Sequence, residues 1–473
     1  MEQIVNDVHS RLNATRVREI IRPARIDDVR EAILRVKREY PDNGGLAICG
    51  GRHAMGGQQF GSDCPLLDMT GMNRAIALDE ERGLLTMEAG AMWPDVVRVT
   101  RDLASGEQRH SIRQKQTGAD TLTLGGAVAC NAHGRGLMMG PIGEDVESLT
   151  LVNADGEVVE CSRDREAELF RLVIGGYGLF GVVVRVTLRL CPRRKFQRLV
   201  DIIDIDDAVN AVRLRVADGC VYGDFQYAID PRDDSFLRRG VMACYRPAPE
   251  GAVVDDETEN LTRENWLLLL ELAHRNKAAA FSKYAQYYLA THGRVYWSDT
   301  MQLSTYMPDY AEFLASRGLM GDGVQESLLI GEQYVPPGRI IEFLERSRAV
   351  LRETGVEVIY GTIRAIRRDQ TSFLPWARED FACVIFNLRT PHTAAGIERT
   401  HETFRKLTDA SLDLGGGFYL TYHRAATAEQ VNRAYPQFRE FLAKKEQYDP
   451  AGVFQSDWYR HYRRLFAECG DKS

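Results

Sequence analysis

The chain has 473 residues, enough for roughly two to four domains and a large buried core. Its 60 basic and 67 acidic residues give a formal net charge of −7, which removes the general electrostatic basis for binding nucleic acid. Hydrophobic residues make up 44% and charged residues 27% of the chain, as in folded globular proteins and unlike disordered chains. We therefore expect a folded protein without a nucleic-acid partner.

The cysteines and the N-terminal region indicate the cellular location to expect. Nine cysteines are scattered along the chain without a CxxC pair or a histidine cluster of zinc-site spacing, which predicts reduced thiols and no metal site. Charges such as Glu2, Asp7 and Arg11 interrupt the N-terminal region, so it lacks an apolar stretch of the secretory type. No run approaches the ~18 apolar residues of a membrane span. We expect a cytoplasmic protein without membrane contact.

The predicted elements begin with an amphipathic helix after Pro23, whose apolar residues recur at helical spacing up to Val36. A short strand at 46–49 follows, and further strands are predicted at 66–69, 75–78 and 84–89. The last two form a hairpin through 79–83. A helix is predicted at 93–103. These elements indicate a mixed structure of short strands and helices.

The later elements are fewer and longer. Strands at 146–153 and 157–161 flank Ala154-Asp155-Gly156, a strong hairpin signal. From about Phe196 the glycine density falls, which suggests a second domain. The remaining predictions are a helix at 166–173, a strand at 182–190, and helices at 266–289, 337–354 and 431–445.

Two glycine-rich segments carry most of the functional information. The first, at 50–58, contains four glycines and follows the strand predicted at 46–49. The second, at 117–136, consists of small residues with almost no charge. Glycine permits unusual backbone dihedral angles and close approach of a ligand, and successive backbone N–H groups bind a diphosphate without lysines. Tight turns explain one such segment equally well, but two of them favour a dinucleotide cofactor.

A third glycine pattern, GxGxxG at Gly176, Gly178 and Gly181, matches the nicotinamide-binding fingerprint in spacing only. That fingerprint requires a strand before the glycines and a helix after them. Here the predicted helix at 166–173 precedes the glycines and the predicted strand at 182–190 follows. We therefore reject nicotinamide binding at this place.

Together with the run 175–183 and the closing turn Tyr448-Asp449-Pro450, these segments resemble the vanillyl-alcohol-oxidase-type flavoproteins, the PCMH-type FAD-binding family. The resemblance extends over nearly the whole chain. It implies an α+β fold with a two-part FAD-binding domain, formed by 1–195 and a C-terminal segment at 425–473. An inserted α/β substrate (cap) domain would occupy 196–424.

The resemblance also implies which residues bind FAD. The diphosphate would lie on the two glycine-rich segments, and the backbone near Gly176 would meet the flavin or adenine. The cofactor-binding residues expected on this basis are Gly50, Gly51, Arg52, His53, Ala54, Met55, Gly57, Gln58, Thr117, Gly118, Thr123, Gly125, Gly126, Ala129, Asn131, His133, Gly134, Gly176, Val182 and Gln455.

Two branches of the family share local features with this chain. The turn 51–58 is similar to that of cytokinin dehydrogenases, and His53 falls on the histidine bonded covalently to the flavin there, although Ala54 replaces the usual serine. The segments 381–386, 419–423 and 449–457 are similar to decaprenylphosphoryl-ribose oxidases, which oxidise a secondary hydroxyl on a sugar. The lysine of that branch near Tyr422 is absent, so the substrate stays open between both branches.

Oxidation of an alcohol needs a base for the O–H proton, aligned with a hydride acceptor. We expect His423 to be this base and Tyr422 to position the substrate or the flavin, since the resemblance places both over the flavin ring. Gln333 and Asn387 are further candidates for hydrogen bonds to a polar substrate. Cys383 lies in an apolar segment, which predicts a buried, unreactive thiol.

These observations predict a FAD-dependent oxidoreductase that moves a hydride from a CH–OH or CH–NH group of a small or sugar-like substrate to flavin N5. The FAD would be attached covalently through His53. Dioxygen or another acceptor would take the electrons. The sequence leaves the oligomeric state open. The alternatives are a C=C reductase related to the side-chain sterol reductases, and a flavoprotein without turnover.

Overall fold

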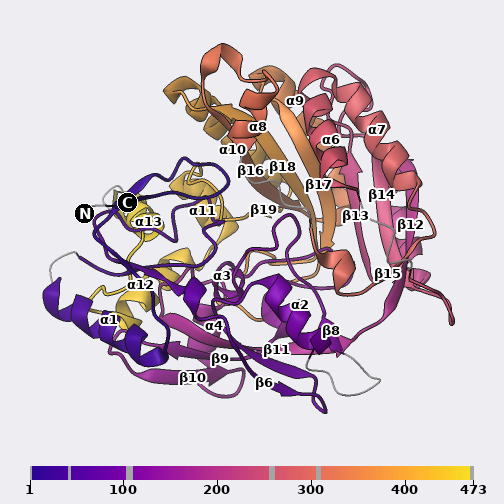
Figure 1. Cartoon of the computed structure of the whole chain (residues 1–473). Coiled ribbons are helices and arrows are strands. Elements are labelled where there is room, and N and C mark those ends of the chain that lie inside the picture. Colours follow the sequence, from indigo (N-terminus) through magenta and orange to yellow (C-terminus); the bar gives the residue numbers. More distant parts are fainter. Residues whose placement is uncertain (1–2, 41–43, 103–109, 255–260, 305–309, 469–473) are drawn as a thin grey trace.

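The computed structural model describes residues 3–40, 44–102, 110–254, 261–304 and 310–468. Two large antiparallel sheets organise this part of the chain (Figure 1). The first has six strands in the order β10-β9-β11-β7-β6, with β8 also paired to β11. Its strands are β6 (Ala75–Asp79), β7 (Leu84–Glu88), β8 (His110–Ile112), β9 (Val146–Val152), β10 (Val158–Ser162) and β11 (Val182–Pro192).

The second sheet has eight antiparallel strands in the order β15-β12-β14-β13-β17-β18-β16-β19. It begins only three residues after the first sheet ends, so the chain crosses from one sheet to the other at Arg193 and Arg194. Its strands are β12 (Lys195–Asp204), β13 (Tyr222–Tyr227), β14 (Arg239–Pro247), β15 (Val295–Trp297), β16 (Glu326–Val335), β17 (Val358–Ile366), β18 (Phe381–Pro391) and β19 (Gly417–Phe418).

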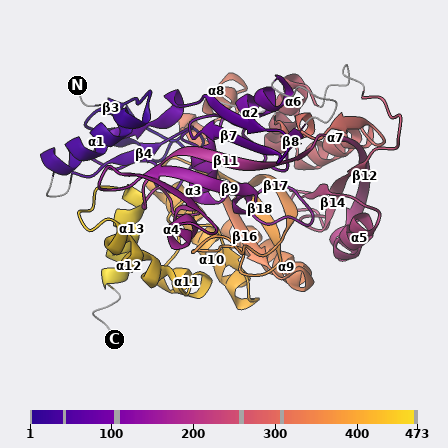
Figure 2. The ribbon, with the colours of Figure 1, turned by 90° about the horizontal axis from the view of Figure 1, so that it is seen from below.

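Two small sheets lie near the N-terminus. Strands β3 (Ile20–Ile21), β5 (Leu66–Asp68) and β4 (Ala47–Cys49) pair in parallel, and β1 (Gln3–Val5) pairs with β2 (Thr15–Val17). The C-terminal segment returns to this region, because Leu46 and Phe454 form a parallel bridge and the Gln455 N–H donates to the Leu46 carbonyl. Both views place α12 and α13 on the side of the N-terminal elements (Figures 1 and 2).

The helices divide into three groups along the chain. The first group accompanies the six-stranded sheet, the second the eight-stranded sheet, and the third forms the C-terminal segment. They are α1 (Ile26–Glu39), α2 (Trp93–Asp102), α3 (Leu124–Cys130) and α4 (Ala167–Val173); α5 (Ile205–Ala217), α6 (Arg263–Arg275), α7 (Lys277–Leu289), α8 (Tyr310–Ser316), α9 (Ile340–Thr354) and α10 (Ala394–Asp413); and α11 (Ala428–Ala434), α12 (Phe438–Tyr448) and α13 (Asp457–Glu468).

The two faces of the eight-stranded sheet have different neighbours. Successive side chains of a strand point to opposite faces. Leu329, Val384 and Phe386 share one hydrophobic cluster with residues of α9 and α10, so that face is a core. The alternate residues, such as Glu332 and Asn387, point toward the opposite face and line a cavity. Strand periodicity thus delivers polar side chains to that inner face.

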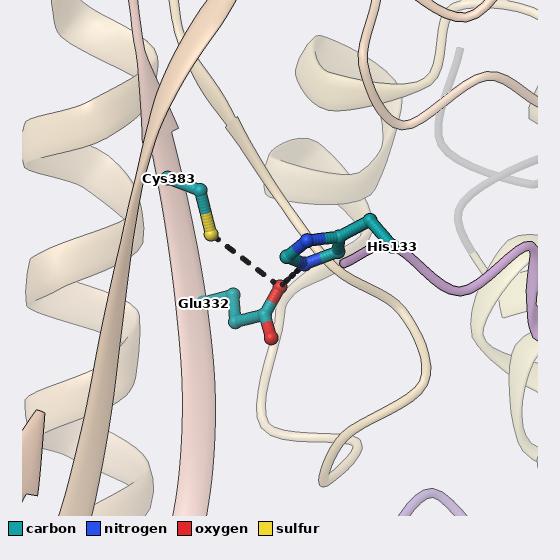
Figure 3. Close-up of side chains that lie close together, drawn as sticks. All are labelled: His133, Glu332 and Cys383. Atoms are coloured by element: carbon teal, nitrogen blue, oxygen red, sulfur yellow. Dashed lines mark hydrogen bonds and ion pairs between the residues drawn. The ribbon is translucent and has the colours of Figure 1, made fainter. Parts of the chain in front are cut away.

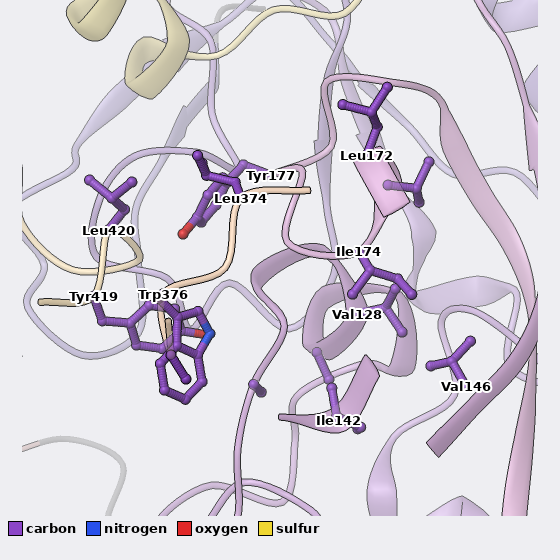
Figure 4. Close-up of a cluster of buried hydrophobic side chains, with 14 of the residues drawn as sticks. Val128, Ile142, Val146, Leu172, Ile174, Tyr177, Leu374, Trp376, Tyr419 and Leu420 are labelled. Carbon is purple, nitrogen blue, oxygen red and sulfur yellow. The ribbon is translucent and has the colours of Figure 1, made fainter. Parts of the chain in front are cut away.

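The largest hydrophobic cluster joins the six-stranded sheet to the C-terminal part of the chain. Residues of the first sheet and of α3 and α4 pack with Leu374, Trp376 and Leu420 (Figure 4). The Trp376 indole N–H donates to the Asn131 carbonyl at 3.0 Å, which fixes the segment after β17 against the end of α3. This packing holds the glycine-rich segments and the inner face of the eight-stranded sheet on opposite sides of one space.

Several sequence predictions are confirmed. Both hairpins form, with β6 pairing β7 and β9 pairing β10. The mixture of helices and antiparallel sheets agrees with the α+β class. The helix precedes and the strand follows Gly176, as the rejection of a nicotinamide fingerprint requires. Leu103, the predicted end of α2, and Cys469 lie outside the described residues, and none of the other eight cysteines is in a disulfide.

Two predicted long helices are wrong, because each is divided in two. The helix predicted at 266–289 breaks at Asn276, whose side chain accepts a hydrogen bond from the Ala279 N–H and caps the second half. The helix predicted at 431–445 breaks at Pro436. The ring of a proline excludes the helical conformation at the preceding residue, and Tyr435 indeed has φ −131° and ψ 75°.

Candidate active site

A cavity of about 800 Å³ lies between the glycine-rich segments and the inner face of the eight-stranded sheet. One wall consists of residues 48–55 and parts of 116–135. The opposite wall comes from β16, β17 and β18, and α6 and α7 close one side. A cavity of this volume is at the upper end of the range for small-molecule and cofactor sites.

The first glycine-rich segment exposes backbone donors to this cavity. The chain leaves β4 at Cys49 and turns with a left-handed Arg52 (φ 58°), whose guanidinium pairs with Asp68 at 3.1 Å. Among the described residues, no acceptor faces the N–H groups of Gly51, Arg52, Ala54 and Met55. All four residues line the cavity. A row of unpaired N–H groups is the donor set that a diphosphate requires, so the segment fits that part of FAD.

The second glycine-rich segment differs from the prediction, because residues Leu124–Cys130 form the short helix α3 and not a turn. Its first N–H groups are already used. Those of Leu124 and Gly125 donate to the carbonyls of Ala91 and Ala89, each at 2.8 Å, and that of Gly126 donates to the Thr123 hydroxyl. The segment therefore lines the cavity with small side chains while offering few free donors.

Two glycines show why small residues are required here. A Cβ atom on Gly51 would lie 2.1 Å from the Thr121 carbonyl oxygen, so the two glycine-rich segments meet in backbone contact. Gly118 has φ 92° and a Cβ atom on it would meet nothing within 4 Å, since the residue borders the cavity. Gly51 allows the two segments to pack together, and Gly118 allows an unusual backbone angle at the border of the cavity.

His53 lines the cavity between two partners. Its Nδ1 lies 2.9 Å from Nε2 of His9 and its Nε2 lies 2.7 Å from the Thr121 hydroxyl. Burial, followed by the neighbouring His9, lowers the pKa of His53 to about 3. The imidazole is therefore neutral at physiological pH and retains a nitrogen lone pair.

A buried carboxylate, that of Glu332, lies beside His133 of the second glycine-rich segment and Cys383 (Figure 3). Glu332 on β16 is 5% exposed. One of its oxygens accepts from His133 Nε2 at 2.9 Å and from the Tyr334 hydroxyl at 2.7 Å, and the other accepts from the Tyr422 hydroxyl at 2.7 Å. The Cys383 thiol lies 3.6 Å from the first oxygen. We call these five residues the carboxylate hub.

The hub holds its charge despite burial. Burial raises the pKa of Glu332, but the His133 charge and the hydrogen bonds from His133, Tyr422 and Tyr334 outweigh it and lower the pKa to about 2. His133 Nδ1 faces the Gly134 carbonyl at 3.1 Å. Both ring nitrogens of His133 thus lie against oxygen atoms. Glu332 is thus an ionised carboxylate paired with His133.

The same donors raise the question of a metal site, since ligand atoms of His133, Glu332 and Cys383 lie within 4.8 Å of one another. Burial and Glu332 raise the pKa of the Cys383 thiol well above its usual range, so the sulfur stays protonated. This agrees with the predicted buried, unreactive thiol. Two tyrosine hydroxyls and His133 already occupy the carboxylate. The geometry therefore favours a hydrogen-bonded hub over a metal centre.

The structure gathers many of the predicted residues around the cavity. Those that line it are Gly50, Gly51, Arg52, His53, Ala54, Met55, Gln58, Thr117, Gly118, Thr123, Gly125, Gly126, Ala129, His133, Asn387 and Tyr422. Those that do not line it are Gly57, Asn131, Gly134, Gly176, Val182, Gln333, His423 and Gln455.

His423 illustrates the second group. Its ring lies against that of His401, with centroids 5.7 Å apart, and burial lowers its pKa to about 3. It follows Tyr422 in the chain but does not reach the cavity wall. Gln455 instead donates to the Gly452 carbonyl at 3.0 Å, within the C-terminal turn.

The sequence predictions include Gln333 as a site residue but not its neighbour Glu332. Strand periodicity could have identified Glu332, because Leu329 and Val335 belong to the core of the sheet and point to the same face as Gln333. Glu332 therefore points to the other face. Arg135, Arg198 and Arg364 were missed as well, and no local motif distinguishes them from surface arginines.

Comparison with known proteins identifies the class of this site. Residues 17–162 match the model of a FAD binding domain, the part of the chain that contains both glycine-rich segments. This match and the relatives below support a PCMH-type FAD-binding oxidoreductase. The matched segment supplies one wall of the cavity described above.

Three relatives indicate how far the similarity extends. L-gulono-1,4-lactone dehydrogenase of Mycobacterium tuberculosis is 25% identical over 84% of this chain and 86% of its own length. Decaprenylphosphoryl-beta-D-ribose oxidase of Mycolicibacterium smegmatis is 21% identical over 92% and 93%. L-gulonolactone oxidase of Mus musculus is 29% identical, but the alignment spans only 36% of this chain and 37% of that protein.

Where the model describes the chain, no helix combines the length and the apolar character needed to cross a bilayer.

Proposed function

We propose that this protein oxidises a CH–OH or CH–NH group of a small, sugar-like substrate with FAD as the hydride acceptor. The observation that carries the proposal is that members of the carboxylate hub and the N–H groups of Gly51, Arg52, Ala54 and Met55, for which no acceptor is found among the described residues, border one cavity. The names of the relatives, which act on sugar lactones or on a ribose derivative, support a sugar-like substrate.

Within this proposal, residues 1–195 and 425–473 hold the cofactor and 196–424 form a cap that carries the substrate side. The N–H groups of Gly51, Arg52, Ala54 and Met55 would hold the diphosphate. FAD supplies the hydride acceptor when bound. His53 is proposed as the covalent attachment point, which its neutral, cavity-lining imidazole supports.

The carboxylate hub accepts the proton of the substrate hydroxyl. Tyr422 lines the cavity and donates to Glu332, so its oxygen is free to accept a hydrogen bond from a substrate hydroxyl. As the hydroxyl loses its proton to Tyr422, the phenol proton moves to Glu332. His133 stabilises the carboxylate and fixes its orientation. His423 has no part in this proposal, because it lies outside the cavity wall.

Anaerobic mixing of the purified holoprotein with sugar lactones, alditols, other alcohols and amines tests the proposal. At least one CH–OH or CH–NH compound is expected to bleach the flavin absorbance. Glu332→Gln should lower the rate of bleaching by about 10²–10⁴-fold, the range for a lost general base, while retaining FAD. Bleaching by NADPH alone would instead favour the reductase, and no bleaching by any compound would favour a flavoprotein without turnover.

Acid precipitation tests the covalent link separately. A yellow wild-type pellet and a colourless His53→Ala pellet are expected. A colourless wild-type pellet would remove the link and leave the oxidoreductase proposal intact.

A further inference from the structure

A second group of charged side chains lines the cavity beyond the carboxylate hub. Arg198 lies on β12, Arg364 on β17, and Arg135 follows α3; we call these three residues the basic cluster. Arg198 is 5% and Arg364 is 9% exposed. Buried arginines ordinarily have a carboxylate partner, because an unpaired charge is costly to remove from water.

Arg364 has no carboxylate partner among the residues that the structure describes. Its guanidinium donates to the Thr117 hydroxyl, and its buried Nε has no acceptor among the described residues. Arg364 pairs in register with Cys383 of the carboxylate hub. Strands are about 4.8 Å apart, and β17 is separated from β16 by β18. The guanidinium therefore stands within reach of a molecule that also touches Tyr422.

Arg135 repeats this pattern. One of its terminal nitrogens donates to the Met301 carbonyl, its guanidinium lies 4.7 Å from the centre of the Tyr245 ring, and its buried Nε has no acceptor in the described part of the chain. A carbonyl dipole and an aromatic face attract a cation but do not neutralise it.

Hydroxyl groups and aromatic rings hold Arg198 in place. Its Nε donates to the Tyr245 hydroxyl at 2.8 Å and a terminal nitrogen donates to the Thr291 hydroxyl at 3.0 Å. Its guanidinium also lies 5.4 Å from the centre of the Tyr288 ring and 4.6 Å from that of Tyr296. This aromatic cage fixes the side chain at the cavity wall.

The acidic groups that the structure describes nearby do not balance the charges of Arg135 and Arg364. Asp224 on β13 lines the cavity and attracts Arg135. Asp120 is engaged with another cation, since it pairs with the buried Lys115 at 2.7 Å. Glu332 is paired with His133. Among the described residues, the cavity wall thus holds one carboxylate without an ion-pair partner, Asp224, against the guanidinium groups of Arg135 and Arg364, so this end of the cavity carries a positive excess.

We propose that the substrate carries an anionic group, a phosphate or a carboxylate, which Arg135 and Arg364 bind while its reacting CH–OH group lies at Tyr422. Guanidinium groups recognise both anions through paired, charge-assisted hydrogen bonds. The apolar wall formed by Trp266, Leu269 and Phe281 borders the same cavity and strengthens the attraction by excluding water. The inference rests on the proposed function for the identity of the reacting group.

An anionic substrate explains the basic cluster better than the FAD diphosphate does. Its diphosphate has its own donors in the first glycine-rich segment, on the opposite wall from β12 and β17. A sugar acid or a sugar phosphate places a charged group a few bonds from an oxidisable hydroxyl, which matches the separation of β17 from β16.

The first experiment measures anion binding without turnover. Inorganic phosphate is titrated into the oxidised holoprotein by calorimetry at constant ionic strength. Wild type should bind it saturably, and Arg135→Met and Arg364→Met should each weaken binding at least tenfold. Arg364→Lys should restore part of it by keeping the charge. Arg213→Met, an exposed position on α5, is the matched control and should bind as wild type does.

No saturable binding in wild type, or equal binding by all variants, would overturn the inference. Loss of FAD from Arg135→Met or Arg364→Met would also overturn it, because the arginines would then serve the cofactor.

The second experiment uses matched substrates in the anaerobic flavin assay. Aldonates are compared with their alditols, and sugar phosphates with the free sugars. The charged member of one pair should reduce the flavin at least tenfold faster, and which pair responds identifies carboxylate or phosphate. Arg135→Met and Arg364→Met should remove the difference, whereas Arg213→Met should keep it.

Equally fast neutral members would refute the anion inference while supporting the proposed oxidoreductase. If no member reduces the flavin, the proposed function fails, and the phosphate titration still decides whether the basic cluster is an anion site.

Discussion

Replacing Glu332 with glutamine removes one charge from the carboxylate hub and almost no volume. The fall in the pKa of Glu332 from 4.5 to about 2 corresponds to about 3 kcal/mol of native-state stabilisation at neutral pH, at about 1.4 kcal/mol for each tenfold change in the ionisation constant. The side chain is 5% exposed, so solvent screens little of this. Glu332→Gln should therefore lower the free energy of unfolding by about 3 kcal/mol at pH 7.

The pH dependence provides the sharper test. The folded pKa is depressed, so the stabilisation is complete above the unfolded pKa of 4.5 and is lost as pH falls toward 2. The difference between wild type and Glu332→Gln should shrink to roughly 1.4 kcal/mol at pH 3.

Urea unfolding of the holoproteins, followed by tryptophan fluorescence, measures both values. Tyr334→Phe serves as the control, because it removes one hydrogen bond to the carboxylate, worth about 1.5–3 kcal/mol, but keeps the carboxylate and its pairing with His133, so its stability should still fall as the pH is lowered. A Glu332→Gln variant as stable as wild type at pH 7, or a difference that does not change with pH, would refute the ionised hub.

Gly51→Ala places a Cβ atom 2.1 Å from the Thr121 carbonyl, so the first glycine-rich segment must shift and FAD occupancy, read from visible absorbance, should fall. Gly338→Ala, where a Cβ meets nothing within 4 Å, should retain full occupancy, and equal occupancy in both variants would contradict the contact between the segments. Asp449 pairs with the buried Lys445 and accepts from two backbone N–H groups of the C-terminal turn. Asp449→Asn should therefore cost about 3–5 kcal/mol of stability, and a thermal midpoint equal to that of wild type would argue against this role.

Local signals explain which parts of the fold were predictable. Asp79 to Gly83 and Ala154-Asp155-Gly156 each connect adjacent strands with residues suited to turns, and both hairpins form. The helix breaks at Asn276 and Pro436 also have local causes. Both residues were present in the predicted helices, but the apolar periodicity was given more weight than the cap and the proline.

The sequence by itself determined the cofactor side of the cavity, because glycine acts on the backbone of its own segment. A glycine-rich turn such as 50–58 has its dihedral freedom from its own residues, whatever the rest of the chain does. Only the tertiary structure decided the substrate side. Glu332, Tyr422 and His133 are far apart in the chain and become one hub when the eight-stranded sheet is placed against α3. Arg135 and Arg364 are brought to the cavity wall without an ion-pair partner among the described residues, a property of the assembled cavity that no local pattern encodes.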